Sequence, residues 1–254
     1  MSAQSTSPAF QACHAVTARW EGTWSDHPAD PGGKTMYGIT EKVWLAWNKA
    51  KGIAKPKPVR QITRAEAEEI YYHDYWLAAR CNTLAPGVDM FTYDSSVNSG
   101  VSRARKWLLA SIGGSDIETI KKMSAARTSF LRALASFAVF GKGWANRITD
   151  VEAQSIKRNL AESNVPAATI VEALKGEATK AATKAASATR NAKATVGGTG
   201  AGGGAAVVTA NQADVIANWV LGGLLVAGTF VLAYFIVRSI IEKSRAKSYQ
   251  EQTA

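Results

Sequence analysis

An uncharged run near the C-terminus places the strongest constraint on how this chain can fold. Residues 215–237, VIANWVLGGLLVAGTFVLAYFIV, contain no Asp, Glu, Lys or Arg. About 20 apolar residues suffice for a helix to cross the hydrocarbon core of a bilayer. Trp219 and Tyr234 lie toward the two ends of the run, where amphipathic rings prefer the membrane interface. We therefore expect one transmembrane helix over residues 214–238, followed by a basic tail over residues 239–254.

The segment before this run has a simple composition. Residues 166–194 are rich in Ala and Lys and contain no aromatic side chain, which favours an exposed helix. The sequence VGGTGAGGGAA follows and is typical of a flexible linker. We expect residues 164–213 to form a helical stalk and a Gly-rich linker.

The first 163 residues show the patterns of a mainly α fold. Apolar residues recur at helical spacing, and no stretch has the sustained alternation of a half-buried strand. The sequences Thr63-x-x-Glu66 and Ser115-x-x-Glu118 predict capping boxes at helix starts. A short hairpin within residues 32–40 is the only β-structure that we expect.

Charge and cysteine content narrow the classes of function. Lys and Arg exceed Asp and Glu by ten, which suits a polyanionic partner such as an anionic membrane or an acidic cell wall. The sequence has no zinc-finger spacing, basic coiled coil or RNA-binding strand motif, so we do not expect nucleic acid as a partner. Cys13 and Cys81 are too few for a disulfide framework and lack metal-ligand spacing. We expect two thiols, with a single disulfide as the alternative.

The stretch WEGTWSDHPADPGGKTMYGIT, residues 20–40, carries the candidate chemistry. Glu21 lies between two tryptophans, and a carboxyl group that loses hydration keeps its proton more readily. Such a group can donate that proton to a leaving oxygen, as glycoside cleavage requires of its general acid. Asp30 is a candidate second carboxylate that stabilises the transition state or orients a water. On spacing alone, an ordinary loop with solvated acids is the commoner explanation.

Four further residues are candidates for substrate binding. Trp24 offers an aromatic face, and Thr35 and Tyr37 supply hydroxyl groups to the same loop. Asn98 is a candidate for binding an N-acetyl group, with a helix C-cap as an equal alternative. This chemistry requires no metal or cofactor.

The motif W-E-G-x-W-S-x-x-P-x-D-P-G-G-x-T-x-Y-G-I-T resembles the opening of the glycoside hydrolase family 108 lysozymes. These N-acetylmuramidases occur in phage endolysins and bacterial secreted proteins. The later segments YYHDYWLAARCNTLAPGVDMF and FGKGWANRITDVE resemble the rest of that domain and an adjoining peptidoglycan-binding domain. The resemblance implies a lysozyme-like muramidase domain over residues 8–92 and a helical peptidoglycan-binding part over residues 93–163. It covers roughly residues 10–160.

The resemblance also assigns roles by position. Glu21 matches the catalytic glutamate of the family, whereas the match of Asp30 to a second acid is weaker. The family commonly has Glu-Gly-Gly-Tyr where this chain has Glu21-Gly22-Thr23-Trp24. An aromatic residue is kept at the fourth position, so we expect activity to be retained.

These observations predict a membrane-anchored N-acetylmuramidase of the endolysin type. It would cleave peptidoglycan between N-acetylmuramic acid and N-acetylglucosamine and so lyse bacterial cells. A lytic transglycosylase is the alternative among enzymes. A non-enzymatic wall-binding or holin-like membrane protein with an inert lysozyme-like domain is the alternative from another class.

Two indications of membrane topology conflict. The cations after residue 237 place the C-terminus in the cytoplasm by the positive-inside rule, which puts the enzyme outside. The N-terminus lacks the basic start and apolar run of a secretory signal, which keeps the enzyme inside. We expect a single-pass protein of the host's inner membrane, held at the inner face until the membrane is breached. Its substrate is then the periplasmic wall. Direct export of the N-terminal part is the alternative.

Overall fold

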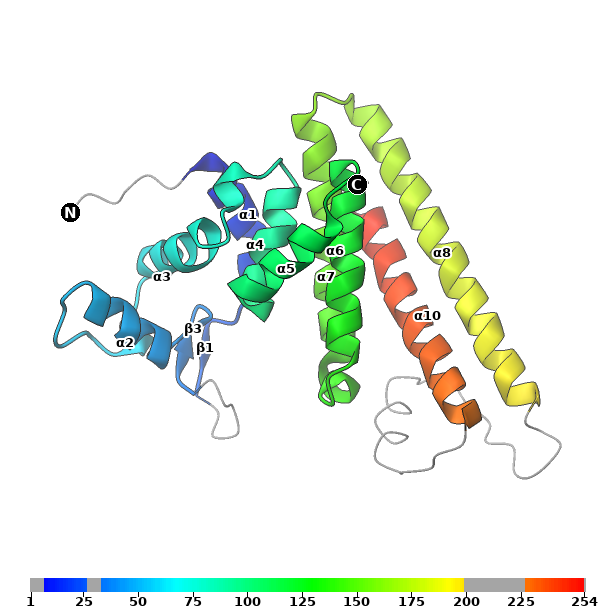
Figure 1. The fold of residues 1–254 in the computed structure, drawn as a ribbon, viewed down its shortest axis with the longest axis horizontal. Helices are drawn as coiled ribbons and strands as arrows, with labels where there is room; N and C mark the ends of the chain where they lie inside the picture. Colours follow the sequence, from blue (N-terminus) through cyan, green and yellow to red (C-terminus); the bar gives the residue numbers. More distant parts are fainter. Residues whose placement is uncertain (1–6, 27–32, 199–226, 254) are drawn as a thin grey trace. The chain divides into compact units, whose positions relative to one another are not determined.

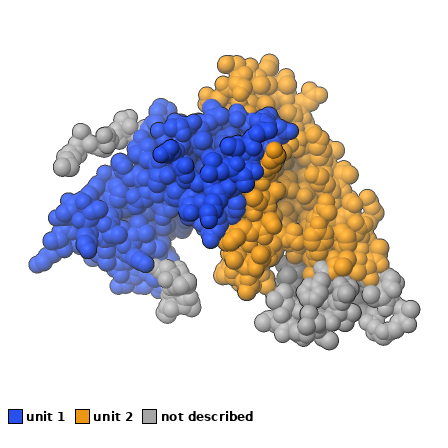
Figure 2. All heavy atoms as spheres, viewed as in Figure 1, with its two compact units in different colours: residues 1–120 blue, residues 121–254 orange. Residues whose placement is uncertain are grey.

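The computed structural model describes residues 7–26, 33–198 and 227–253 (Figure 1). The chain forms two compact units, Met1–Ile120 (unit 1) and Lys121–Ala254 (unit 2) (Figure 2). The described residues form nine α-helices and one small antiparallel sheet, as expected for a mainly α fold. The domain limits that the sequence suggested stay a prediction.

Unit 1 is built from short helices with one small sheet inserted among them. Its α-helices are α1 (Pro8–Ala18), α2 (Glu41–Ala50), α3 (Arg64–Tyr71), α4 (Val88–Ser99) and α5 (Val101–Ser111). A further helix, α6 (Asp116–Arg132), begins in unit 1 and continues into unit 2. Short turns of other helix types lie between them: η1 (Val59–Gln61), the π-helix η2 (Tyr72–Leu77) and η3 (Cys81–Thr83).

Side-chain caps fix where several of these helices begin. The predicted capping box at α3 is confirmed: the Glu66 backbone N–H donates to Thr63 Oγ1, and the Thr63 backbone N–H donates to the Glu66 carboxylate. The same reciprocal pair joins Ser115 and Glu118 at the start of α6. Each box satisfies backbone donors that the first turn of a helix leaves unpaired.

The sheet has three strands, β1 (Trp24–Ser25), β2 (Thr35–Met36) and β3 (Ile39–Thr40). β2 and β3 form the hairpin that the sequence predicted, with Thr35 opposite Thr40. β1 was not expected; it pairs with β2 and places Trp24 opposite Met36. This pairing joins the segment after α1 to the hairpin and so brings both ends of the Gly- and Pro-rich stretch together.

An aromatic cluster forms the centre of unit 1. The Phe10 ring of α1 lies 5.1 to 5.8 Å from the rings of Tyr72, Trp76 and Tyr93, in edge-to-face arrangements. Phe10, Trp76 and Tyr93 are almost completely buried. Such pairs stabilise a core beyond the area that they bury, by about 1 kcal/mol each. The cluster holds α1, η2 and α4 together and thereby fixes the helix that precedes Glu21.

Unit 2 contains the remainder of α6 and three long helices: α7 (Phe137–Glu162), α8 (Ala167–Gly198) and α10 (Ala227–Glu251). Hydroxyl contacts set their register. Thr149 Oγ1 of α7 lies 2.9 Å from Ser244 Oγ and 3.1 Å from Ser248 Oγ of α10. Thr189 Oγ1 of α8 lies 2.8 Å from Ser239 Oγ. α10 therefore runs between its two neighbours with small polar side chains at the contacts.

The structure corrects the expectation of an exposed stalk. α8 forms as a helix, but one of its faces is buried over most of its length. The buried positions alternate in steps of four and three, which is the spacing of a seam between packed helices: Leu174, Ala178, Ala181, Ala185, Ala188 and Ala192. Alanine allows close approach of α10, so a sequence with little apolar surface still packs tightly.

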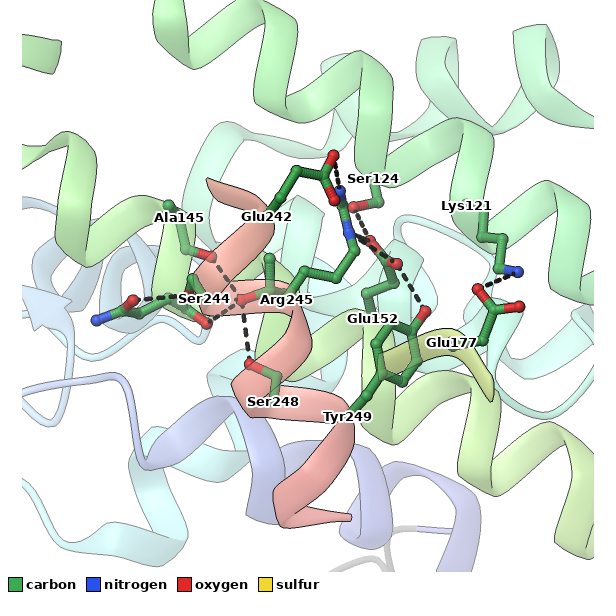
Figure 3. Close-up of polar contacts among 12 residues, drawn as sticks. Lys121, Ser124, Ala145, Glu152, Glu177, Glu242, Ser244, Arg245, Ser248 and Tyr249 are labelled. Atoms are coloured by element: carbon green, nitrogen blue, oxygen red, sulfur yellow. Dashed lines mark hydrogen bonds and ion pairs between the residues drawn. The ribbon is translucent and has the colours of Figure 1, made fainter. Parts of the chain in front are cut away.

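A buried polar network joins α6, α7 and α10 (Figure 3). Glu152 of α7 accepts hydrogen bonds from Ser124 and, at 2.7 Å, from the Tyr249 hydroxyl. Arg245 Nε lies 3.2 Å from Glu152 Oε1, and Arg245 Nη1 lies 2.8 Å from Glu242 Oε1. Burial alone would lower the pKa of Arg245, but the two carboxylates outweigh it and raise that pKa. The network fixes α10 in one register.

Three predictions fall wholly or partly outside the described residues. The Gly-rich linker lies outside them except for the last turn of α8, and so does Asp30. Of the predicted membrane span, only residues from 227 onward are described, and they form the start of α10. Among the described helices, none combines the length and the apolar character needed to span a membrane. Cys13 and Cys81 are both buried free thiols, and burial raises the pKa of Cys81.

Candidate functional site

A cavity of about 330 Å³ opens in unit 1 beside Glu21. Two helices form most of its wall, and each contributes positions i, i+3, i+4 and i+7, which share one face of a helix. Its lining residues are Gln11, His14, Ala15 and Ala18 of α1, Arg64, Ala67, Glu68 and Tyr71 of α3, and Glu21, Gly22, Thr23 and Tyr37 of the segments between them.

The end of α1 places Glu21 on the cavity wall. α1 ends at Ala18, three residues before Glu21. The backbone N–H of Trp20 donates to Thr17 O at 3.0 Å, and that of Glu21 donates to Ala18 O at 3.2 Å. These two bonds turn the chain directly after the helix. Glu21 is half-buried, while Trp20 is 36% exposed.

Gly38 allows Glu21 to approach Tyr71. Its φ of +75° favours glycine, and a Cβ atom at this position would overlap the Tyr71 hydroxyl oxygen. The same Cβ would lie 2.9 Å from Glu21 Oε2, which is too close for a carbon atom. The Tyr-Gly-Ile-Thr segment therefore provides a side-chain-free position against which a carboxyl and a phenol group pack.

Hydrogen bonds hold the hairpin turn against the same wall. The Tyr37 backbone N–H donates to Thr23 O at 2.7 Å, and the Tyr71 hydroxyl donates to Tyr37 O at 3.0 Å. Tyr37 itself has φ of +51°, which is unusual for a residue with a side chain. The Arg64 guanidinium lies 4.8 Å from the centre of the Tyr37 ring. α3 thus orients the turn through both its first and its last residue.

The cavity wall includes a buried histidine. His14 is buried, and burial lowers its pKa to about 4, so its ring is neutral at neutral pH. Its Nδ1 lies 2.8 Å from the hydroxyl of Tyr93. Burial, followed by the charges of Asp74 and Glu21, raises the pKa of Tyr75. The Tyr75 hydroxyl therefore remains protonated and can donate a hydrogen bond.

The structure separates the predicted site residues into two groups. Glu21 and Tyr37 line the cavity together. Trp24 and Thr35 lie in the adjoining sheet, and neither lines the cavity. The Trp24 ring stacks against the Arg60 guanidinium at 5.0 Å, and Thr35 Oγ1 donates to Gly33 O.

Asn98 is not brought to this site by the fold. It is exposed near the end of α4 and accepts a hydrogen bond from Ser99 Oγ at 3.2 Å. The C-cap of α4 is Gly100, so the alternative prediction of a capping role for Asn98 is also not what the structure has.

Sequence reasoning missed the helical half of the cavity. His14, Arg64, Glu68 and Tyr71 were not among the predicted site residues, although each faces the same space as Glu21. The signal was present as a stripe of mixed polar and small residues at helical spacing on α1 and on α3. A stripe of this kind suits the wall of a polar cavity better than a hydrophobic core.

The arrangement can perform acid–base chemistry with protein groups alone. Glu21 and Glu68 are the two carboxyl groups of the cavity wall within the described part of the chain. Among the described residues, no group of three or more His, Cys, Asp or Glu side chains is placed to hold a metal ion. A carboxyl group on the wall of a cavity can transfer a proton to or from a bound molecule.

Comparisons with known proteins agree with this geometry. The family Glycosyl hydrolase 108 matches residues 14–100, a range that contains all of the cavity wall except Gln11. Among solved structures, SagA of Brucella abortus is 31% identical; the similarity covers 59% of this chain and 95% of SagA, with a TM-score of 0.53. No curated protein matches the chain. The chain therefore belongs to glycosyl hydrolase family 108.

Proposed function

We propose that the protein is an N-acetylmuramidase. It hydrolyses the bond between N-acetylmuramic acid and N-acetylglucosamine in bacterial peptidoglycan, in an endolysin-like role. The observation that carries the proposal is the position of Glu21 on the wall of a cavity within the region of the family match. The cavity lies between two helices and a hairpin, so a sugar unit can enter beside this carboxyl group.

Glu21 acts as the general acid. It transfers its proton to the glycosidic oxygen as the bond from that oxygen to the anomeric carbon breaks. Water then adds to the anomeric carbon and gives up a proton to a carboxylate of the site, either the ionised Glu21 or the second acid. The packing of Glu21 against Gly38 and Tyr71 supports this role because it fixes the carboxyl group in one place. Fixed geometry of this kind lowers the entropic cost of reaching the transition state.

A second carboxylate stabilises the positive charge that develops on the sugar ring or orients the water. Asp30 keeps this proposed role from its place in the sequence. Glu68 is a further candidate because it lines the cavity from α3. Tyr37 lines the cavity as a proposed sugar contact. For Trp24, Thr35 and Asn98, sugar binding outside the cavity remains a proposal that rests on residue type.

Product analysis tests this function. Purified peptidoglycan is digested with the full chain, and the released fragments are analysed by mass spectrometry. We expect fragments that end in reducing N-acetylmuramic acid. Ends in 1,6-anhydro-N-acetylmuramic acid would identify a lytic transglycosylase instead. Reducing N-acetylglucosamine ends, or no fragments from a folded protein, would contradict the proposed cleavage.

We further propose that residues 215–237 attach the enzyme to the bacterial inner membrane. Their lack of charge supports this. A single crossing would put the two ends of the run on opposite faces of the bilayer. However, Ser239 of α10 contacts Thr189 of α8, which comes before the run. Residues after 238 must therefore leave α7 and α8 before the run can cross the membrane once.

A cross-link between the two helices tests the single crossing. Thr189→Cys and Ser239→Cys replace two hydroxyl groups that lie 2.8 Å apart. We expect the disulfide to form in protein released from membranes and to be absent from protein that resists extraction with carbonate. Full cross-linking in the carbonate-resistant fraction would rule out a single crossing while leaving the hydrolase proposal untouched.

A further inference from the structure

Three helix ends of unit 2 lie at the same end of the unit. α7 begins with Phe137, α8 ends at Gly198 and α10 begins with Ala227. Asn146 of α7 contacts Ser244 of α10, and Glu152, further along α7, contacts Tyr249, further along α10. The two helices are therefore parallel neighbours, and their first turns lie together at the lower end of unit 2 in Figure 1. The contact of Thr189 with Ser239 brings the last turns of α8 to the same end.

Among the described residues, this end of unit 2 carries cations and no acids. Residues 128–149, 178–198 and 227–241 contain no Asp or Glu, and we call them the acid-free end. They contain eight basic residues: Arg132, Lys142, Arg147, Lys180, Lys184, Arg190, Lys193 and Arg238. All seven acids in the described part of unit 2 lie in the other halves of these helices, where they are mixed with nine bases. Charge is therefore segregated along the helix axes.

The acid-free end also exposes large apolar side chains. Val139 and Phe140 on the first turns of α7 are 74% and 55% exposed. Val231 and Tyr234 on the first turns of α10 are 46% and 43% exposed. Most other large apolar residues in the described part of unit 2 are buried or half-buried, so this exposure is concentrated where the three helices end.

Cations and aromatic rings are interleaved on this surface. The Arg132 guanidinium lies 5.1 Å from the centre of the Tyr234 ring, which links the end of α6 to the start of α10. Arg238 Nη1 lies 3.4 Å from the Tyr234 hydroxyl. On α7, the rings of Phe140 and Trp144 are 5.8 Å apart, and Lys142 of the same turns is exposed. The surface therefore offers both charge and apolar area to a single partner.

We propose that the acid-free end of unit 2 docks onto the surface of an anionic lipid bilayer. Basic side chains are drawn to anionic headgroups, while exposed aromatic and aliphatic side chains enter the interface between headgroups and acyl chains. A bilayer is favoured as the partner because the uncharged run of residues 215–237 leads directly into the start of α10 at this end. The proposal rests on neither the hydrolase chemistry nor a crossing of the membrane.

Vesicle binding by the full chain tests the proposal. Vesicles of phosphatidylcholine alone are compared with vesicles that contain phosphatidylglycerol as well. We expect preference for the anionic vesicles, and weaker binding as salt rises, since salt screens exposed charges. The triple variant Lys142→Gln, Lys184→Gln and Lys193→Gln should bind anionic vesicles on the order of 100-fold more weakly, about fivefold for each lysine. All three lysines are exposed, so folding is preserved.

A matched triple variant controls for net charge. Lys157→Gln, Lys175→Gln and Lys243→Gln remove three exposed lysines from the other half of unit 2, and binding should change by less than about threefold. Equal losses in both triple variants would overturn the proposal in favour of bulk charge attraction. Equal binding of wild type to both kinds of vesicle would also overturn it, because the uncharged run alone then accounts for attachment.

A second pair of variants tests the apolar contribution. Phe140→Ser should weaken binding to anionic vesicles about tenfold, because one aromatic side chain no longer enters the interface. Leu109→Ser is the control, since Leu109 is 62% exposed but belongs to α5 of unit 1. The proposal fails if Phe140→Ser binds like wild type or if Leu109→Ser loses as much.

Discussion

Two glutamates with aromatic neighbours have opposite surroundings in the two units. Glu152 in unit 2 has a side chain that is only 3% exposed, and it is bound by Ser124, Arg245 and Tyr249. Glu21 in unit 1 is half-buried and lies against a cavity of about 330 Å³. The difference is the space beside the carboxyl group, which only Glu21 shares with a molecule from outside.

This difference separates a structural carboxylate from one that can react. Glu152 lies on α7 and its partners come from α6 and α10, so its charge helps to assemble the three helices. Glu21 lies beside Gly38, and the absence of a side chain at this position leaves room for the carboxyl group. We expect substitution of Glu152 to change stability and substitution of Glu21 to change activity.

The largest effect on stability should come from Glu152→Gln. The change leaves Arg245 buried with one carboxylate partner, Glu242, in place of two. Loss of one member of a buried ion pair costs about 3 kcal/mol of unfolding free energy. Urea unfolding of the full chain measures the change. Glu251→Gln on the same helix is the control, because its pair with Lys247 is exposed and contributes little.

An effect of similar size should appear in the pH dependence of the stability of unit 1. Burial lowers the pKa of His14 from 6.5 to about 4, so the unfolded chain binds a proton below pH 6.5 that the folded chain does not bind until about pH 4. The neutral His14 ring contributes fully to the free energy of unfolding above pH 6.5. This contribution, on the order of 3 kcal/mol, is lost as the pH falls toward 4.

The variant His14→Gln removes this proton linkage. Its unfolding free energy should fall less steeply than that of wild type between pH 6.5 and 4, as followed by urea unfolding at each pH. His73→Gln replaces a half-buried histidine outside the cavity wall and should keep the wild-type slope. Parallel curves for wild type and His14→Gln would contradict the burial of a neutral ring.

A third comparison isolates crowding at the cavity from backbone strain. Gly38 and Gly52 have φ of +75° and +73°, but only the Cβ at position 38 would meet other atoms. Gly52→Ala should cost about 1 kcal/mol from the positive φ alone. Gly38→Ala should cost about 2 kcal/mol more and slow peptidoglycan digestion, because Tyr71 and Glu21 must move. Similar results for the two variants would show that the contacts around Gly38 are unimportant.

Local sequence signals predicted much of unit 1. The capping boxes at Thr63 and Ser115 appear as expected because they depend on residues three positions apart. The short hairpin within residues 32–40 was also predicted, and β2 and β3 form it. Glu21 was identified by a motif, and the fold places it on a cavity wall.

Contacts distant in sequence could not be predicted in the same way. Tyr71 reaches Tyr37 across 34 positions, and no pattern near either residue indicates the pairing. The polar network of Glu152 with α10 spans more than 90 positions. The buried alanines of α8 recur in steps of four and three, which is a periodic signal visible in the sequence. In the sequence, the alanine content indicated an exposed helix, whereas in the structure it allows close packing.

The digestion rate of the Glu21→Gln variant tests the central claim most directly. The initial rate of fragment release from purified peptidoglycan is measured per mole of folded protein, beside wild type and Glu68→Gln. The account predicts a loss of about 1,000-fold for Glu21→Gln, because the general acid is removed while its shape is kept. It predicts a smaller loss of digestion rate for Glu68→Gln. The unfolding free energy of Glu21→Gln should lie within about 1 kcal/mol of that of wild type. A folded Glu21→Gln protein that digests peptidoglycan at the wild-type rate would contradict it.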